Sequence, residues 1–172
     1  TMGIKEDAPF VFPYHDHYIG LTMDLAYNFC LEKKYNLIIQ KYNDYDELLT
    51  CVTSGQCDFA GSTISITDER KKIVNYSTPY YTNKISVFCN RDNLYVDMSS
   101  LSGKTIGTIK SSYYSSLINE FISSANTKEY DTTKELVAAL NANKIDAIIL
   151  KRDADLLYKN CHYQLLKYTY QI

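Results

Sequence analysis

A segment in the first half of the chain recurs in the second half, and this near-repeat constrains the fold more than any other feature. Residues 47–58 and 135–146 align without a gap: each begins with Glu-Leu and an aliphatic residue and ends with an aspartate before an apolar run. Each segment is typical of a helix, a tight turn at Gly55 or Asn143, and a buried strand. Although any helix–strand unit shares part of this pattern, two such units predict two similar α/β lobes.

The repeat also predicts where a ligand would bind. Thr63 and Lys151 take equivalent places just past the carboxyl ends of the two equivalent strands. Ligands of open α/β sheets bind outside these strand ends. Two lobes that face each other would therefore bring both residues to one cleft.

Segments with helical and strand periodicity alternate along the rest of the chain. Helices are expected at 20–34, 46–53, 112–123, 134–141 and 153–159, with one helical turn at 68–72. In the first helix one apolar face would consist of Leu21, Leu25, Phe29 and Cys30. Strands are expected at 35–40, 58–64, 84–89, 105–109 and 145–150. Strands separated by helices predict parallel sheets with helices on their faces.

The boundary between the lobes is expected near 89–94, where Arg91-Asp92-Asn93 is polar and turn-like. This division gives a first lobe over 1–90, a second lobe over 91–164, and a return strand over 165–172. No long linker separates the lobes, so we expect them to be closely hinged.

Composition excludes several classes of function. The 172 residues are 45% hydrophobic and 22% charged, with a net charge of -2, which is ordinary for a globular protein. No Lys/Arg cluster is long enough to follow a phosphate backbone, so nucleic acid is not an expected partner. The apolar runs are too short to span a bilayer. The N-terminus lacks a secretory-signal pattern, and we expect any encoded signal to have been removed.

The five cysteines do not identify a cellular compartment. Cys30, Cys51, Cys57, Cys89 and Cys161 form neither a CxxC pair nor a zinc-type spacing. Because their number is odd, at least one is unpaired within the chain. Cys30 and Cys51 lie on predicted apolar helix faces and are interpreted as small buried hydrophobic residues. A local Cys51–Cys57 disulfide is the alternative, which spacing alone does not establish.

The strongest local signal is the segment 61–70, in which a strand runs into hydroxyl residues and then a basic residue. Hydrogen bonds can come from the hydroxyl and backbone groups of Ser62, Thr63 and Ser65. Arg70 offers a planar fork that matches a carboxylate. The alternative is a surface ion pair between Arg70 and one of its neighbours, Asp68 or Glu69.

The counterpart in the second lobe is Lys110-Ser111-Ser112-Tyr113, which follows a strand and opens a helix. Free N–H groups at such a position form an anion site. N-capping of the helix by Ser111 or Ser112 is the plainer interpretation, and the two are compatible.

No catalytic, metal or cofactor site is expected. The motif His15-Asp16-His17 lies in a polar loop and is interpreted as solvated, and the third histidine, His162, lies far from it in the sequence. The chain has no Ser/His/Asp arrangement, GxSxG or P-loop pattern.

Several short motifs follow one another in a fixed order: residues 8–10 (APF), 20–26 (GLTMDLA), 45–49 (YDELL), 66–72 (ITDERKK), 76–81 (YSTPYY), 103–107 (GKTIG) and 144–147 (KIDA). Each is weak alone, but their order and spacing are specific. Over residues 3–159 the chain resembles the polar amino-acid solute-binding proteins of ABC transporters. It is also similar to the ligand-binding core of ionotropic glutamate receptors.

The resemblance implies a two-lobed α/β fold of the type II periplasmic-binding-protein class, whose hinged lobes close on a central ligand cleft. It implies a protein in the periplasm or outside the cell, with or without a membrane anchor. Such a protein would capture a small carboxylate-bearing ligand, preferably an amino acid, for an ABC transporter permease.

Site residues carry over by position. Arg70 would bind the α-carboxylate, Ser65 and the backbone at Thr63 would bind polar groups, and Tyr45 would lie against the ligand side chain. Asp7 falls near a ligand position in the first loop. From the second lobe, Lys110 and the segment 111–113 would close over the carboxylate.

The chain departs from the family pattern at Lys151, where an acid usually binds the ligand ammonium. Either the ligand lacks a standard α-amino group, or Asp7, Asp153 or another acid takes that role. Lys151 could instead pair with a second ligand carboxylate. The chain is also short, because the resemblance implies a further helical segment and a completed return strand, of which 165–172 would be the start.

Two other functions stay open. A ligand-sensing domain of a receptor or kinase would have the same sequence features. An enzyme of the cyclohexadienyl dehydratase type would need a general acid in the cleft, and no residue is clearly placed for that role. We therefore expect a binding protein and not an enzyme.

Overall fold

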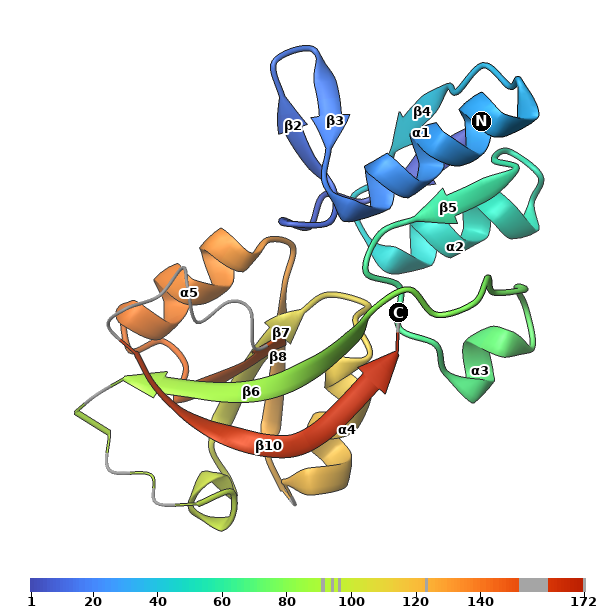
Figure 1. Cartoon of the computed structure of the whole chain (residues 1–172). Coiled ribbons are helices and arrows are strands. Elements are labelled where there is room, and N and C mark those ends of the chain that lie inside the picture. Colours follow the sequence, from blue (N-terminus) through green and yellow to red (C-terminus); the bar gives the residue numbers. More distant parts are fainter. Residues whose placement is uncertain (91, 94, 96, 123, 152–160, 172) are drawn as a thin grey trace. The chain divides into compact units, whose positions relative to one another are not determined.

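The chain forms two compact units, residues 1–78 and 79–171, each with its own sheet (Figure 1). This computed structural model describes residues 1–171 except 91, 94, 96, 123 and 152–160, with side chains described up to Lys151. The observed boundary, between residues 78 and 79, comes earlier than the expected one after residue 90. Strand β6 (Thr82–Asn90) belongs to the second unit because it hydrogen-bonds into that unit's sheet.

The first unit is built on a parallel sheet with the order β4-β1-β5. Its strands are β1 (Met2–Ile4), β4 (Ile39–Lys41) and β5 (Phe59–Gly61), with Met2 opposite both Ile39 and Phe59. The helices are α1 (Leu21–Lys33), α2 (Tyr45–Thr53) and the short α3 (Asp68–Lys71). Between β1 and α1 the strands β2 (Phe12–Tyr14) and β3 (His17–Ile19) form an antiparallel hairpin.

The buried face of α1 differs from the expected one. Leu21, Leu25 and Phe29 remain 40%, 45% and 46% exposed. The buried face consists of Thr22, Met23, Ala26 and Cys30, so of the expected residues only Cys30 is buried. Met23 and Ala26 pack into a core with β1, and since a helix buries one stripe, the neighbouring stripe stays outside.

The second unit has a five-stranded sheet with the order β10-β6-β9-β7-β8. Its remaining strands are β7 (Thr105–Ile109), β8 (Asn126–Tyr130), β9 (Ala147–Lys151) and β10 (Cys161–Gln171). Strand β7 pairs in parallel with β9, as predicted, and with β8, which was not predicted, whereas β6 pairs antiparallel with β9 and β10. The helical elements are η1 (Ser99–Leu101), α4 (Tyr114–Phe121) and α5 (Thr133–Asn141).

Four of the predicted helices are confirmed as α1, α2, α4 and α5, and the predicted turn at 68–72 is confirmed as α3. The predicted helix at 153–159 lies outside the described residues. The strand expected at 35–40 is found only from Ile39, because the Tyr35 N–H still donates to the carbonyl of Cys30 and closes α1. The return strand begins earlier than expected, at Cys161.

Both copies of the sequence repeat fold alike, α2 leading to β5 and α5 leading to β9. Asp44 and Thr132 cap the two helices, accepting hydrogen bonds from the N–H groups of Glu47 at 2.8 Å and Glu135 at 3.2 Å. The Glu135 side chain accepts in return from the N–H of its cap Thr132, which completes a capping box, whereas the Glu47 side chain accepts from the N–H of Asn43, the residue before its cap. These caps define where each helix begins.

The turn that follows each helix also repeats. Gly55 has φ 78° and Asn143 has φ 54°, the left-handed region that glycine and asparagine tolerate best. The two turns that the sequence repeat aligned therefore also share a backbone conformation.

Replacing Gly55 tests this requirement for a positive φ. A Cβ added at Gly55 would meet no atom within 4 Å, so Gly55→Ala should cost only backbone strain, about 1–2 kcal/mol. We expect a lower urea midpoint with an unchanged slope. Gly55→Asn is the matched control and should lose less stability. Equal stability of the alanine variant and the wild type would show that position 55 does not require a positive φ.

Candidate functional site

Polar residues in the first unit follow the carboxyl ends of two neighbouring parallel strands. Lys5 and Asp7 come after β1, and Ser62 and Thr63 come after β5. The Ser62 hydroxyl donates to the Lys5 carbonyl at 2.9 Å, and the Thr63 hydroxyl donates to the Asp7 carboxylate. Because these bonds join two loops far apart in the sequence, they hold the polar groups at one edge of the sheet.

The ring of Tyr45 lies at the centre of this group. Tyr45 is the first residue of α2, and its hydroxyl hydrogen-bonds that of Thr63 at 2.9 Å in a buried position. The Lys5 Nζ atom lies 5.2 Å from the ring centroid, and the Arg70 guanidinium carbon lies 5.8 Å from it. Both distances are typical of cation–π contacts.

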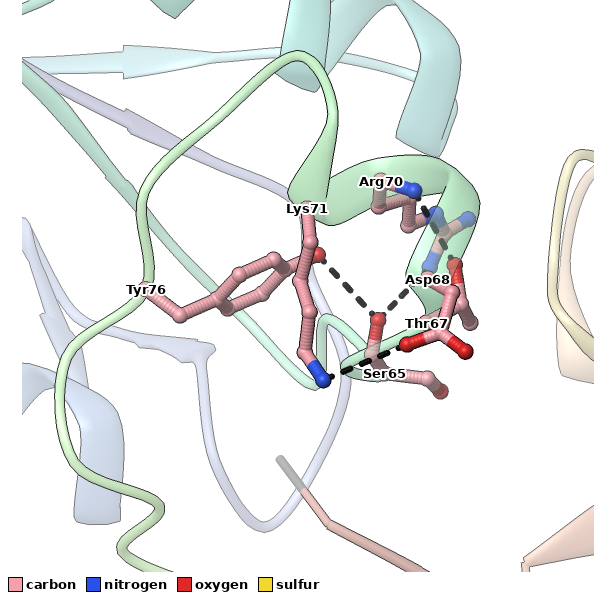
Figure 2. A network of polar contacts seen from close by, with 6 residues as sticks. All are labelled: Ser65, Thr67, Asp68, Arg70, Lys71 and Tyr76. Carbon is pink, nitrogen blue, oxygen red and sulfur yellow. Dashed lines mark hydrogen bonds and ion pairs between the residues drawn. The ribbon is translucent and has the colours of Figure 1, made fainter.

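A network of hydrogen bonds places Arg70 (Figure 2). The Thr67 hydroxyl caps α3 by accepting from the Arg70 backbone N–H at 3.2 Å. The Ser65 carbonyl accepts from the Arg70 Nη1 atom at 3.4 Å and from the Tyr76 hydroxyl at 3.2 Å. One carbonyl therefore orients both the guanidinium and a phenol.

The groups around Arg70 include an exposed ion pair and a half-buried phenol. Asp68, one of the two acids considered as a competing ion-pair partner, is bridged to Lys71 Nζ at 3.3 Å in an exposed position. Burial raises the pKa of Tyr76 above its ordinary value, and the Arg70 charge opposes that rise. The phenol is thus a neutral donor at physiological pH.

These groups have complementary chemistry. A guanidinium can bind a carboxylate through two hydrogen bonds, the carboxylate of Asp7 can accept from an ammonium, and the Tyr45 ring can lie against an apolar or cationic side chain. Lys5 and Tyr76 were not among the predicted residues. Their signals were a lysine directly after a buried strand and a tyrosine at the start of the motif at 76–81.

The predicted loop of the second unit follows β7. Lys110 is exposed, and its N–H donates to the Tyr130 carbonyl at 2.9 Å. Ser111 has φ 55°, and the Ser112 hydroxyl lies 3.3 Å from that of Thr108. Helix α4 begins only at Tyr114, with Tyr113 at its N-cap and no side-chain capping bond. The plainer expectation, capping by Ser111 or Ser112, is therefore wrong, because both serines lie in the turn before the helix.

Lys151 is the last residue of β9 and is only 9% exposed. It pairs with Ile85 of β6. Asn83 lies two residues from Ile85 and therefore on the same face of the sheet. Its side-chain oxygen accepts from the Lys84 N–H at 2.7 Å, and its buried Nδ2 has no hydrogen-bond partner in the described part of the chain.

The structure thus gathers the predicted residues of the first unit, Asp7, Tyr45, Ser62, Thr63, Ser65 and Arg70, around one sheet edge. In the second unit, Lys110 to Tyr113 follow β7 and Lys151 ends β9, and these are neighbouring parallel strands. One cleft shared by both sets stays a prediction. Among the described residues no group of three or more histidine, cysteine or acidic side chains could hold a metal ion, and no helix is long and apolar enough to cross a membrane.

Comparison with known proteins identifies related chains. The arginine-binding extracellular protein ArtP of Bacillus subtilis is 28% identical over 153 residues, which cover 87% of this chain and 60% of that protein. A probable histidine-binding protein of Campylobacter jejuni is 29% identical over 150 residues, covering 84% and 56%. The chain therefore spans a little over half the length of these relatives.

A solved structure shares the fold. The ancestral amino acid-binding protein AncCDT-1, a precursor of cyclohexadienyl dehydratase, matches 99% of this chain and 77% of its own with a TM-score of 0.86 and 20% identity. This confirms the predicted type II periplasmic-binding-protein fold. The model of one protein family, the bacterial extracellular solute-binding proteins of family 3, matches residues 1–151. The chain belongs to the family 3 bacterial extracellular solute-binding proteins.

Proposed function

We propose that this chain is the ligand-binding part of an extracytoplasmic protein that captures an amino acid and presents it to an ABC transporter permease. The observation that carries the proposal is the arrangement of Tyr45 and Arg70, an aromatic ring beside an oriented guanidinium at the carboxyl ends of β1 and β5. Family membership and relatives named for binding arginine and histidine support it.

Each side chain of the first unit has a role in this proposal. Arg70 binds the α-carboxylate, and Tyr45 lies against the ligand side chain. Ser62, Ser65 and the backbone at Thr63 contribute hydrogen bonds to polar groups. Asp7 accepts from the ligand ammonium, for which the Thr63 hydroxyl already orients its carboxylate.

The second unit contributes cationic and donor groups. Lys110 and the segment 111–113 also bind the carboxylate. Lys151, at the end of β9, pairs with a second carboxylate of the ligand. The Nδ2 atom of Asn83, on the same face, supports this role, because a buried donor that has no partner among the described residues favours an acceptor atom.

An enzyme on the same fold is the second candidate, since AncCDT-1 is a precursor of cyclohexadienyl dehydratase. A dehydratase would form product from prephenate or arogenate, whereas a binding protein binds ligand stoichiometrically and returns it unchanged. Incubation of the purified protein with these two compounds separates the candidates.

A thermal-shift screen across amino acids and small dicarboxylates tests the class of ligand. A ligand present at about 100 times its Kd stabilises the folded state by about 2.7 kcal/mol, which raises the melting midpoint by roughly 5–10 °C. We expect such a rise with at least one amino acid. Absence of a shift across the whole panel would argue against the proposal.

Arg70→Ala tests the anchor. Loss of a charge-assisted pair with the ligand carboxylate should weaken binding by roughly 2–5 kcal/mol, measured by isothermal titration calorimetry. Lys71→Ala is the matched control, because it removes a neighbouring cation whose ion pair is exposed. Full affinity of the Arg70→Ala variant for the ligand would show that Arg70 does not bind it.

Lys151→Met tests recognition of a second carboxylate, since methionine keeps much of the side-chain length without the charge. We expect affinity for a dicarboxylic amino acid to fall about tenfold, the effect of about 1.4 kcal/mol, with little change for a monocarboxylic one. Lys84→Met provides the control, because Lys84 is exposed on the neighbouring strand β6. Equal losses for both ligands would show that Lys151 does not distinguish them.

A further inference from the structure

Two cysteines lie together beneath the first unit's sheet, outside the proposed ligand site. Cys51 is on α2 and Cys57 directly precedes β5, and they are 1% and 3% exposed. The Cys57 N–H donates to the Cys51 carbonyl at 2.8 Å. This contact brings the two Cα atoms within the range that a disulfide spans, roughly 4.4–6.8 Å.

The two sulfur atoms lie on the same side of the sheet, next to β1. A Cβ built on Gly3 would be 2.6 Å from the Cys51 sulfur and 3.2 Å from the Cys57 sulfur. The sulfurs therefore cannot be farther apart than the sum of these distances. Glycine at position 3 is what lets the strand pass so close to both.

Each thiol has a polar contact outside the pair, and the Cys51 thiol donates to the Leu48 carbonyl at 3.1 Å. Burial, and then a hydrogen bond with Cys57, raises the pKa of Cys51 to about 11. The Tyr42 hydroxyl lies 3.4 Å from the Cys57 sulfur. No acidic or histidine side chain joins the described group into a metal site, so the pair is better suited to bonding with itself.

We propose that Cys51 and Cys57, which are thiols in this structure, are a disulfide-forming pair that is oxidised when the protein folds outside the cytoplasm. Family 3 proteins are extracellular, and such compartments favour disulfides. The inference does not depend on the identity of the ligand.

The reaction is a thiol–disulfide exchange with the disulfide of an oxidoreductase. One cysteine thiolate attacks that disulfide, forming a mixed disulfide and releasing one oxidoreductase thiolate. The second cysteine thiolate then attacks the mixed disulfide, forming the Cys51–Cys57 bond and releasing the other. Two electrons and two protons pass to the oxidoreductase, which becomes a dithiol. Because burial and a high pKa disfavour attack in the folded state, we expect the exchange to precede packing of α2.

The bond would join the end of α2 to the start of β5, which lie side by side (Figure 1). Helix α2 begins with Tyr45, and β5 leads to Thr63. A crosslink here would therefore hold together the two elements that carry the hydrogen-bonded pair Tyr45 and Thr63.

Peptide mapping of the full-length protein, secreted by its own route, tests the proposal. The protein is denatured in iodoacetamide without reductant, digested, and analysed by mass spectrometry. Since no basic or aromatic residue separates the two cysteines, we expect one peptide that contains both Cys51 and Cys57 without alkylation, lighter by two hydrogen atoms than its reduced form. Cys30, buried on α1, serves as an internal control and should be alkylated. Alkylation of both Cys51 and Cys57, or a bond from either to another cysteine, would overturn the proposal.

Thermal unfolding gives a second measurement. The secreted wild type should lose roughly 5–10 °C in melting midpoint when reductant is added, as expected for a short crosslinked loop. The double variant Cys51→Ala/Cys57→Ala should melt at the same temperature with and without reductant. If the variant does not fold, the peptide map of the wild type still shows whether Cys51 and Cys57 form a disulfide. An unchanged wild-type midpoint on reduction would count against a stabilising disulfide.

Discussion

The parallel pairing of β1 with β5 is the constraint on which the first unit and its polar cluster depend. It brings the carboxyl ends of two strands, more than fifty residues apart in the sequence, to one sheet edge. Close approach on both sides is needed for this pairing. A Cβ on Gly61 would be 2.2 Å from the Met2 methyl carbon, and one on Gly3 would be 2.6 Å from the Cys51 sulfur. Glycine in both strands therefore permits the close packing that forms this sheet edge and brings the polar cluster together.

Preorganisation is the second property of the cluster. The Ser65 carbonyl orients Arg70 and Tyr76, the Thr63 hydroxyl orients Asp7, and the Tyr45 hydroxyl is held by Thr63. Groups that are held in place by the protein lose less conformational entropy when a ligand binds. The same bonds satisfy polar atoms that would otherwise be buried without partners. In the proposed function, one set of hydrogen bonds would therefore serve both stability and ligand recognition, and the proposed Cys51–Cys57 bond would brace the helix and strand that carry it.

Sequence patterns predicted the long elements better than the short ones. Helices α2 and α5 begin at side-chain caps and α4 has one apolar face, and all four long helices, α1 included, were found close to their expected bounds. The three-residue strands β1, β2 and β3 were missed, since three residues carry too little periodicity to be detected. The exposed strand β8 was missed because it lacks an apolar pattern, with most of its residues in contact with solvent. The face of α1 was predicted wrongly because two neighbouring stripes are both apolar, and only packing against β1 selects the one that contains Met23 and Ala26.

The sequence by itself determined the repeated unit: its capped helix, its left-handed turn and its buried strand follow from local residue preferences at Asp44, Thr132, Gly55 and Asn143. It also indicated Arg70 and the hydroxyl segment, because strand ends and helix starts can be recognised locally. Only the tertiary structure decided that Lys5 and Tyr76 join this group, that Ser111 and Ser112 do not cap α4, and that the neighbouring thiols of Cys51 and Cys57 are both buried against β1. These outcomes depend on contacts between strands and loops far apart in the chain, which no local pattern encodes.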